Sequence, residues 1–221
     1  MENLTTDVIN NILGIKESYQ ASDTLMKILF DKEKREKVFR EFLEYEKNLD
    51  FDWFHIYFEE EHANKLKFAQ DFTPDSISKI VSRIVAETAR ENNSMTLDTA
   101  AGTGSLTIQK WNDDRLKVSP FDYRPSNYFY RCEELSDRAL PFLVFNLMVR
   151  GMNAIVIHGD ALNREAKQVY FIQNDEDDHM MFSNLNVMPH SLDVEKEFDI
   201  RHWLEEAIDH KESSLFIERG E

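Results

Sequence analysis

The chain is organised around one short stretch, Leu97-Asp98-Thr99-Ala100-Ala101-Gly102-Thr103-Gly104-Ser105. The apolar residues Met95 and Leu97 predict a strand, and residues 106–111 predict a helix directly after the glycines. Glycine allows a tight turn and the close approach of a ligand, and a helix start offers free N–H groups to oxygen-rich ligands. A Gly-x-Gly pair is also compatible with a plain strand-to-helix turn. The other motifs of the chain decide between a ligand-binding loop and a plain turn.

The composition indicates a folded and strongly acidic protein. The chain has 221 residues, of which 42% are hydrophobic, enough for one domain or one domain with a helical extension. Its 42 acidic and 26 basic residues give a net charge of -16. Proteins that bind DNA without a partner protein normally carry a basic surface. We therefore expect contact with DNA only through a partner protein, or no DNA ligand at all.

Other features concern location and metals. No apolar run reaches the ~18 residues of a membrane span, and the N-terminus Met1-Glu2-Asn3-Leu4 lacks the pattern of a signal peptide. The single Cys132 excludes an internal disulfide. His55 and His62 are seven residues apart, which fits no standard ligand spacing. We expect a cytoplasmic protein with no membrane association and no metal.

The hydrophobic pattern divides the chain into a helical N-terminal region, residues 1–67, and a second unit, residues 68–221. The first has helical spacing throughout, as in Val38, Phe39 and Phe42. The second alternates strands and helices, with strands near 95–98, 127–132 and 154–158. This alternation predicts an α/β fold, a parallel sheet with helices on both faces.

Beyond the third strand the pattern is looser. We expect a short strand over Val169–Ile172 and a fourth strand over Met180–Asn184. A last amphipathic helix is expected from the spacing of four apolar residues, Ile200, Trp203, Leu204 and Ile208.

Each of the three clear strands ends in an acid: Asp98, Glu134 and Asp160. Ligands of open parallel sheets bind at the carboxyl ends of the strands. A glycine turn, an acid for a ribose diol and an acid for an adenine amine together suit an adenine nucleoside. No phosphate site is expected, because the chain has no Gly-x-x-x-x-Gly-Lys loop. Taken alone, each acid is equally explained as a helix cap.

These motifs resemble those of the S-adenosylmethionine-dependent adenine DNA methyltransferases, especially the methylation subunits of type I restriction-modification systems. The matching segments, in the family's order, are Phe72-Thr73-Pro74, Asp98 to Gly104, Glu134 with Asn146-Leu147, and Gly159-Asp160-Ala161-Leu162. The resemblance covers roughly residues 65–165. It implies the Rossmann-like class I methyltransferase sheet and S-adenosylmethionine as cofactor.

The resemblance also implies roles for individual residues. Glu134 would hold the ribose hydroxyls, and Asp160 the adenine amine. The methionine part would be surrounded by Thr73, Asp98, Gly102 and Gly104. The remaining candidates for cofactor binding belong to the same motifs: Phe72, Thr99, Ala100 and Ala161.

The catalytic motif departs from the family. In place of Asn-Pro-Pro followed by Tyr or Phe, the chain offers Ser183-Asn184-Leu185-Asn186-Val187. Asn184 can supply the amide, but both prolines are gone and Val187 replaces the aromatic ring on which a flipped base stacks. Asn184 is therefore the one catalytic candidate, and an ordinary strand-end turn is the alternative interpretation.

Two function hypotheses remain. The first is an adenine-specific DNA methyltransferase, or its catalytic subunit, that relies on another chain for DNA binding. The second is a catalytically inactive methyltransferase-fold protein, an interaction or regulatory component of the mobile-element or anti-restriction type.

The C-terminal region suggests an assembly. In the methyltransferase sheet the fourth strand lies next to the first, and few residues remain here to cover its outer side. We expect a homodimer or a hetero-complex through this region. The alternative is that the last helix and residues 165–175 seal the edge within one chain.

Overall fold

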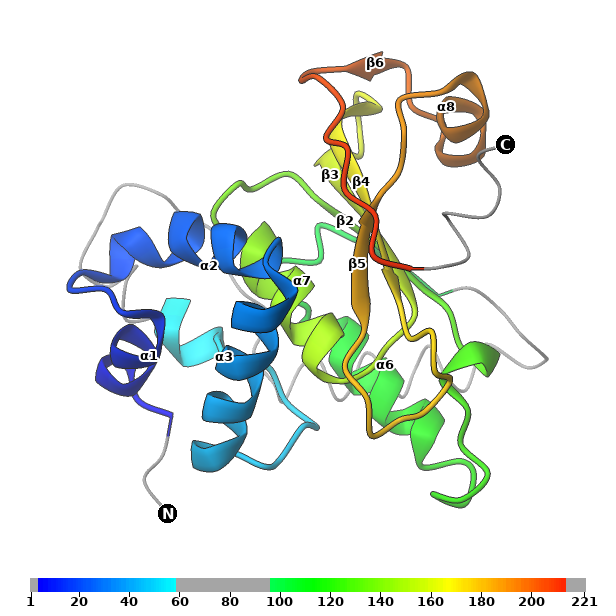
Figure 1. Ribbon diagram of the computed structural model, residues 1–221. Coiled ribbons are helices and arrows are strands. Elements are labelled where there is room, and N and C mark those ends of the chain that lie inside the picture. Colours follow the sequence, from blue (N-terminus) through cyan, green and yellow to red (C-terminus); the bar gives the residue numbers. More distant parts are fainter. Residues whose placement is uncertain (1–3, 59–95, 214–221) are drawn as a thin grey trace.

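The structure is a computed structural model and describes residues 4–58 and 96–213 (Figure 1). The expected domain boundary at 67/68 lies outside the described residues. The N-terminal part forms a helical layer, as expected, although residues 46–52 are irregular. Its elements are α1 (Thr6–Leu13), η1 (Ser18–Gln20), α2 (Ala21–Leu29) and α3 (Lys32–Tyr45).

The helix ends of this layer follow the local sequence. Thr5 caps α1 by accepting a hydrogen bond from the N–H of Val8 at 3.3 Å, and Gly14 ends the helix in the left-handed conformation. Asp31 caps α3 in the same way, accepting from the N–H of Lys34 at 3.2 Å.

The rest of the described chain is a mixed α/β unit. Three parallel strands, β1 (Thr96–Thr99), β2 (Tyr130–Glu134) and β3 (Ala154–Asp160), are connected through α6 (Ser105–Arg115), η2 (Pro125–Asn127) and α7 (Leu140–Val149). β4 (Glu165–Gln173) and β5 (Asn184–Val187) extend the sheet in the order β1-β2-β3-β4-β5. α8 (Leu192–Phe198) and β6 (His202–Trp203) follow, and β6 pairs with β4.

Helices cover both faces of the sheet, as the sequence predicted. Every residue of α7 is buried, because it lies between the sheet and α2 (Figure 1). On the opposite face Val194 and Phe198 of α8 pack with Ile155 and Ile157 of β3 in a second apolar cluster. The α/β fold class is confirmed.

The fourth strand does not lie where it was expected. Residues 180–183 form a turn, and β5 begins at Asn184. β5 pairs with β4 and so lies at the far end of the sheet from β1. The prediction of a fourth strand beside the first is therefore wrong.

The cause is a tight hairpin that turns the chain back after β3. Gly159 lies so close to β4 that an added Cβ would be 2.2 Å from the carbonyl oxygen of Glu165. The carboxylate of Asp160 accepts from the N–H groups of Leu162 at 2.8 Å and Asn163 at 3.1 Å, and Arg164 completes the turn at φ 60°. β4 therefore returns antiparallel beside β3.

The prediction of a last helix over residues 200–208 is also wrong. Asp199 ends α8 in the left-handed conformation, and the following residues are extended as β6 and an irregular segment. The side chain of Gln168 on β4 holds this segment through the carbonyl of Glu206 at 2.7 Å and the N–H of Ile208 at 3.3 Å. Bonds to the sheet replace those that a helix would make.

The same segment lies along the outer edge of β5. The N–H of Val187 donates to the carbonyl of His210 at 2.8 Å, and the side-chain amide oxygen of Asn186 accepts from the N–H groups of Glu212 and Ser213 at 2.8 and 3.0 Å. The C-terminal segment, rather than a last helix, therefore covers this edge of β5, and the homodimer or hetero-complex expected here stays a prediction.

A charged cluster joins α8 to the sheet. Glu133, only 2% exposed, accepts from Arg131 at 2.6 Å and from Arg164 at 3.0 Å. Arg164 also donates to the carbonyl of Phe198 at 2.6 Å, at the end of α8. The two arginines balance the charge of the buried carboxylate and supply its hydrogen bonds. Arg164 thereby links the β3–β4 turn to α8.

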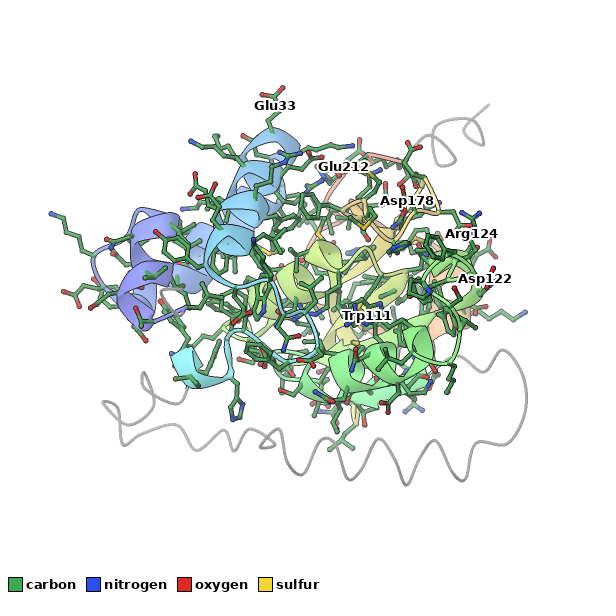
Figure 2. All side chains as sticks on the ribbon, turned by 90° about the horizontal axis from the view of Figure 1, so that it is seen from below. Glu33, Trp111, Asp122, Arg124, Asp178 and Glu212 are labelled. Carbon is green, nitrogen blue, oxygen red and sulfur yellow. The ribbon has the colours of Figure 1, made fainter. Side chains whose placement is uncertain are left out.

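A buried ion pair fastens the C-terminal segment to the helical layer. Arg35 of α3, 1% exposed, donates two hydrogen bonds to Glu212, at 2.8 and 2.6 Å. Figure 2 shows Glu212 where this segment passes α3. Glu212 also accepts from the N–H of Leu185 in β5 at 2.9 Å. One carboxylate therefore connects α3, β5 and the C-terminal segment.

We predict that Glu212→Gln lowers the free energy of unfolding by about 3–5 kcal/mol, because it leaves a buried arginine without its counter-charge. Urea unfolding at pH 7 measures the change. Glu197→Gln, at an exposed position of α8, is the control and should cost less than about 0.5 kcal/mol. A loss below 1 kcal/mol for Glu212→Gln would contradict the assigned role.

The same pair predicts a pH dependence. Burial raises the pKa of Glu212, but the bonds from Arg35 outweigh it and hold the pKa below its usual value of 4.5. A lowered pKa in the folded state means that the stabilisation is complete above pH 4.5 and is lost as the pH falls through the folded value. The stability gap between wild type and Glu212→Gln should therefore narrow below pH 4.5.

Candidate functional site

The glycine stretch forms a tight loop between β1 and α6. Ala100, Gly102 and Gly104 have φ values of 62°, 60° and 100°, all in the left-handed region. An added Cβ on Gly104 would be 2.9 Å from Leu143 of α7, so the loop is pressed against that helix. α6 begins at Ser105, and its first N–H groups lie at the carboxyl edge of the sheet.

Asp98 lies in β1 directly before this loop. Its carboxylate accepts from the hydroxyl of Thr107 in α6 at 2.8 Å, and that hydroxyl is 3.4 Å from the sulfur of Cys132. Burial raises the pKa of Asp98, and the bonds from Thr107 offset part of the rise. The charge of Asp98 is therefore unfavourably placed in the chain alone.

Glu134 at the end of β2 reaches across to the loop. Its two oxygens accept from the N–H groups of Gly102 and Ser136, each at 2.7 Å. Burial raises the pKa of Glu134, its backbone donors lower it, and the nearby charge of Asp98 raises it further. The structure thus brings Asp98, Glu134 and the glycine loop together, as the sequence predicted.

Asp160 lies at the same edge of the sheet, at the end of β3. β3 pairs with β2, and Glu134 is opposite His158, two residues before Asp160. The N–H groups of Asn163 and Leu162 hold the pKa of Asp160 below its usual range. Asp160 therefore stays ionised while it shapes the hairpin turn, and Ala161 follows it in that turn.

Two exposed apolar side chains flank this edge and were not predicted as site residues. Leu135 follows Glu134 and is 58% exposed, and Leu162 follows Asp160 and is 92% exposed. Large apolar side chains at a polar edge are suited to covering the faces of a planar ring. Their positions one and two residues after Glu134 and Asp160 were the available signal.

Asn184, the catalytic candidate, is not brought to this site. Asn184 begins β5, opposite Gln173 at the end of β4, which is the amino end of the parallel strands. Its side chain donates to Asp175 at 2.8 Å. Asn184 therefore lies at the opposite end of the sheet from Asp98, Glu134 and Asp160. Phe72 and Thr73 lie outside the described residues.

Asp52 is a residue of the site that sequence reasoning missed. It is 3% exposed and binds the hydroxyls of Thr103 and Ser105 in the glycine loop. Asn146, noted in the sequence only as part of a motif, donates to Asp52 and to the carbonyl of Thr103, both at 2.8 Å. An isolated acid before an aromatic patch gives no sequence signal for such a contact.

Comparison with known proteins identifies the family. The model of the N-6 DNA methylases matches residues 51–212. The chain belongs to the N-6 DNA methylase family. This membership implies S-adenosylmethionine as its cofactor. No curated protein matches the chain.

One solved structure aligns with the chain. It is a crystal structure from Listeria monocytogenes, assigned to the class I S-adenosylmethionine-dependent methyltransferases, with 19% sequence identity and a TM-score of 0.44. The alignment covers 72% of this chain and 50% of the other, so the chain spans about half the length of that protein.

The residues at the carboxyl edge fit this cofactor. S-Adenosylmethionine carries a sulfonium and an amino group, both positive. The groups that lower the pKa values of Asp98 and Glu134 are a threonine and backbone N–H groups, rather than a lysine or an arginine. A buried and a half-buried acid without a cationic partner are electrostatically suited to a cationic ligand.

Two further structural findings concern metal ions and membranes. Across residues 4–58 and 96–213 no three or more His, Cys, Asp or Glu side chains gather in a way that would hold a metal ion. In the same residues no helix has the length and apolar character needed to cross a membrane.

We predict that Asp98→Asn stabilises the ligand-free chain at pH 7. A raised pKa means that the charged carboxylate is less favourable in the folded state than in the unfolded chain. Removing the charge therefore relieves a free-energy cost of folding, which exists only above the pKa that Asp98 has in the unfolded chain. We expect the thermal midpoint to rise on the order of 2 °C, roughly 1 kcal/mol or less for a chain of this size.

The control for this prediction is the same measurement at pH 3.8, the usual pKa of an aspartate, where the wild-type Asp98 is largely protonated because its own pKa is raised. The difference in thermal midpoint between wild type and Asp98→Asn should be smaller at that pH. A lower midpoint for Asp98→Asn at pH 7 would contradict the electrostatic interpretation.

Proposed function

We propose that this chain binds S-adenosylmethionine at the carboxyl ends of β1, β2 and β3, as the cofactor-binding part of an adenine-specific DNA methyltransferase. The observation that carries the proposal is a pair of acids, the half-buried Asp98 and the buried Glu134, beside a loop with three left-handed residues. The family match over residues 51–212 supports it.

Each residue at the edge has a defined part in this proposal. Glu134 would accept hydrogen bonds from the ribose hydroxyls, since the lone pairs of its carboxylate outnumber its backbone donors Gly102, Leu135 and Ser136. Asp160 would accept from the adenine amine, between the apolar side chains of Leu135 and Leu162. Asp98 would lie against the positively charged methionine part.

When bound, the cofactor would supply a methyl group activated by its sulfonium. The acceptor that the family name indicates is the N6 amine of adenine in DNA. The chain's own residues would bind and orient the cofactor and withhold it from water.

Methyl transfer would also need a residue that accepts hydrogen bonds from the adenine amine. Asn184 lies at the amino end of the strands and does not meet that need. We propose that the catalytic motif comes from outside the described residues or from a partner chain.

The second candidate function is a cofactor-binding interaction protein without methyl transfer of its own. The displacement of Asn184 and the net charge of -16 favour it. In either case we propose a cytoplasmic role beside a restriction-modification component, of the kind carried by phages and mobile elements.

The first test is calorimetric titration with S-adenosylmethionine. Glu134→Ala should weaken binding by about 1–3 kcal/mol, the cost of lost hydrogen bonds to a charged acceptor. Glu197→Ala, at an exposed position of α8, is the matched control and should bind like wild type. Equal affinities of Glu134→Ala and wild type would refute the proposed site.

The second test concerns DNA. Because the chain carries a net charge of -16, we expect weak binding to duplex DNA without sequence preference. A basic partner protein would then supply the affinity. Fluorescence anisotropy with mixed-sequence duplexes at several salt concentrations measures this. Tight, salt-sensitive binding by the purified chain would favour a complete enzyme instead.

A further inference from the structure

We propose that Asp52 is a positioning residue for the glycine loop, and that through it the segment of residues 46–53 sets the affinity of the chain for S-adenosylmethionine. The inference rests on the proposed function and names a control element outside the sheet. Asp52 precedes the matched motifs by 46 residues or more in the described chain, and it touches the loop rather than the ligand edge.

The carboxylate of Asp52 has all of its acceptor positions filled. One oxygen accepts from the N–H of Phe54 at 2.9 Å and from the side chain of Asn146 at 2.8 Å. The other accepts from the hydroxyls of Thr103 and Ser105, the latter at 3.0 Å. Four donors saturate an ionised carboxylate, so the hydroxyls of the loop are fixed in one orientation.

A nearby arginine balances the buried charge. Arg150 donates to the backbone oxygen and the side-chain oxygen of Asn146 at 2.7 and 2.9 Å, so Asn146 connects it to Asp52. Burial lowers the pKa of Arg150 to about 9, and the charge of Asp52 opposes that fall. Arg150 also holds the carbonyls of Leu49 and Phe51 at 2.8 and 2.6 Å, which fixes the segment that carries Asp52.

The loop is consequently held by two carboxylates from different elements. The N–H of Gly102 binds Glu134 of β2, and the hydroxyl of the next residue, Thr103, binds Asp52. Release of the second bond would free the side chain of Thr103, which lies between the two left-handed glycines Gly102 and Gly104. Because a preformed site loses less entropy on binding, such a release should lower cofactor affinity.

The test compares two substitutions of one buried residue. Thr103→Val keeps the shape and removes the hydroxyl that donates to Asp52, whereas Thr103→Ser keeps the hydroxyl. We expect Thr103→Val to raise the Kd for S-adenosylmethionine about tenfold, and Thr103→Ser to stay within about twofold of wild type. Calorimetry well below the thermal midpoint keeps every variant folded.

A matched control separates positioning from general support. Gln109 of α6 is 4% exposed and donates to the carbonyl of Asp50 at 2.6 Å, so it joins the same segment to the same helix without touching the loop. Gln109→Met should lower stability and leave the Kd of the folded protein unchanged.

Hydrogen exchange of the ligand-free protein gives a second readout. Thr103→Val should speed exchange in peptides covering residues 100–107, while Thr103→Ser and Gln109→Met should not.

The outcomes are distinguishable. Weaker binding and faster loop exchange confined to Thr103→Val support the inference. An unchanged Kd for Thr103→Val in a chain whose wild type binds, or equal weakening by Gln109→Met, would overturn it and leave the proposed function standing. A wild type that does not bind S-adenosylmethionine would defeat both.

Discussion

The structure depends above all on one buried carboxylate, that of Asp52. It joins the N-terminal helical layer to the glycine loop and, through Asn146, to α7. A buried charge is tolerated only when its hydrogen bonds are complete and a counter-charge is near, and here four donors and Arg150 meet both conditions. The helical layer is thus part of the site's framework, because the loop conformation and the layer are fixed by the same group.

The sheet combines two different halves. The parallel half, β1 to β3, ends in the acids and the glycine loop and has the features of a ligand-binding edge. The antiparallel half, β4 and β5, has a supporting role. Arg164, in the turn before β4, binds Glu133 of β2 and the end of α8, and Glu212 ties β5 to α3. The acids and the glycine loop therefore lie in one half, and the departures from the expected topology lie in the other.

The sequence was informative where periodicity and motif spacing determine structure. The apolar strands, the glycine turn and the acids at strand ends predicted β1 to β3 and the meeting of Asp98 with Glu134. Prediction from the sequence failed where the backbone conformation of single residues decides the topology. Gly159 and Arg164 turn the chain into a hairpin, which no periodicity reveals. The spacing of Ile200, Trp203 and Leu204 suited a helix, but bonds from Gln168 hold the segment that follows them extended. Asp52 was missed because its partners in the loop and α7 lie 51 to 94 residues away.

The ion pair between Arg35 and Glu212 also orders the events of folding. Its members are 177 residues apart, so the contact closes nearly the whole chain. At about 5–20 residues per second, a ribosome would make α3 roughly 9–35 s before Glu212 exists. During that interval Arg35 has no carboxylate from the C-terminal segment, although Phe39 and Phe42 of α3 can already pack on Phe145 once α7 has been made. The bond between Arg35 and Glu212 consequently forms late, well after the helical layer that it fastens has been synthesised.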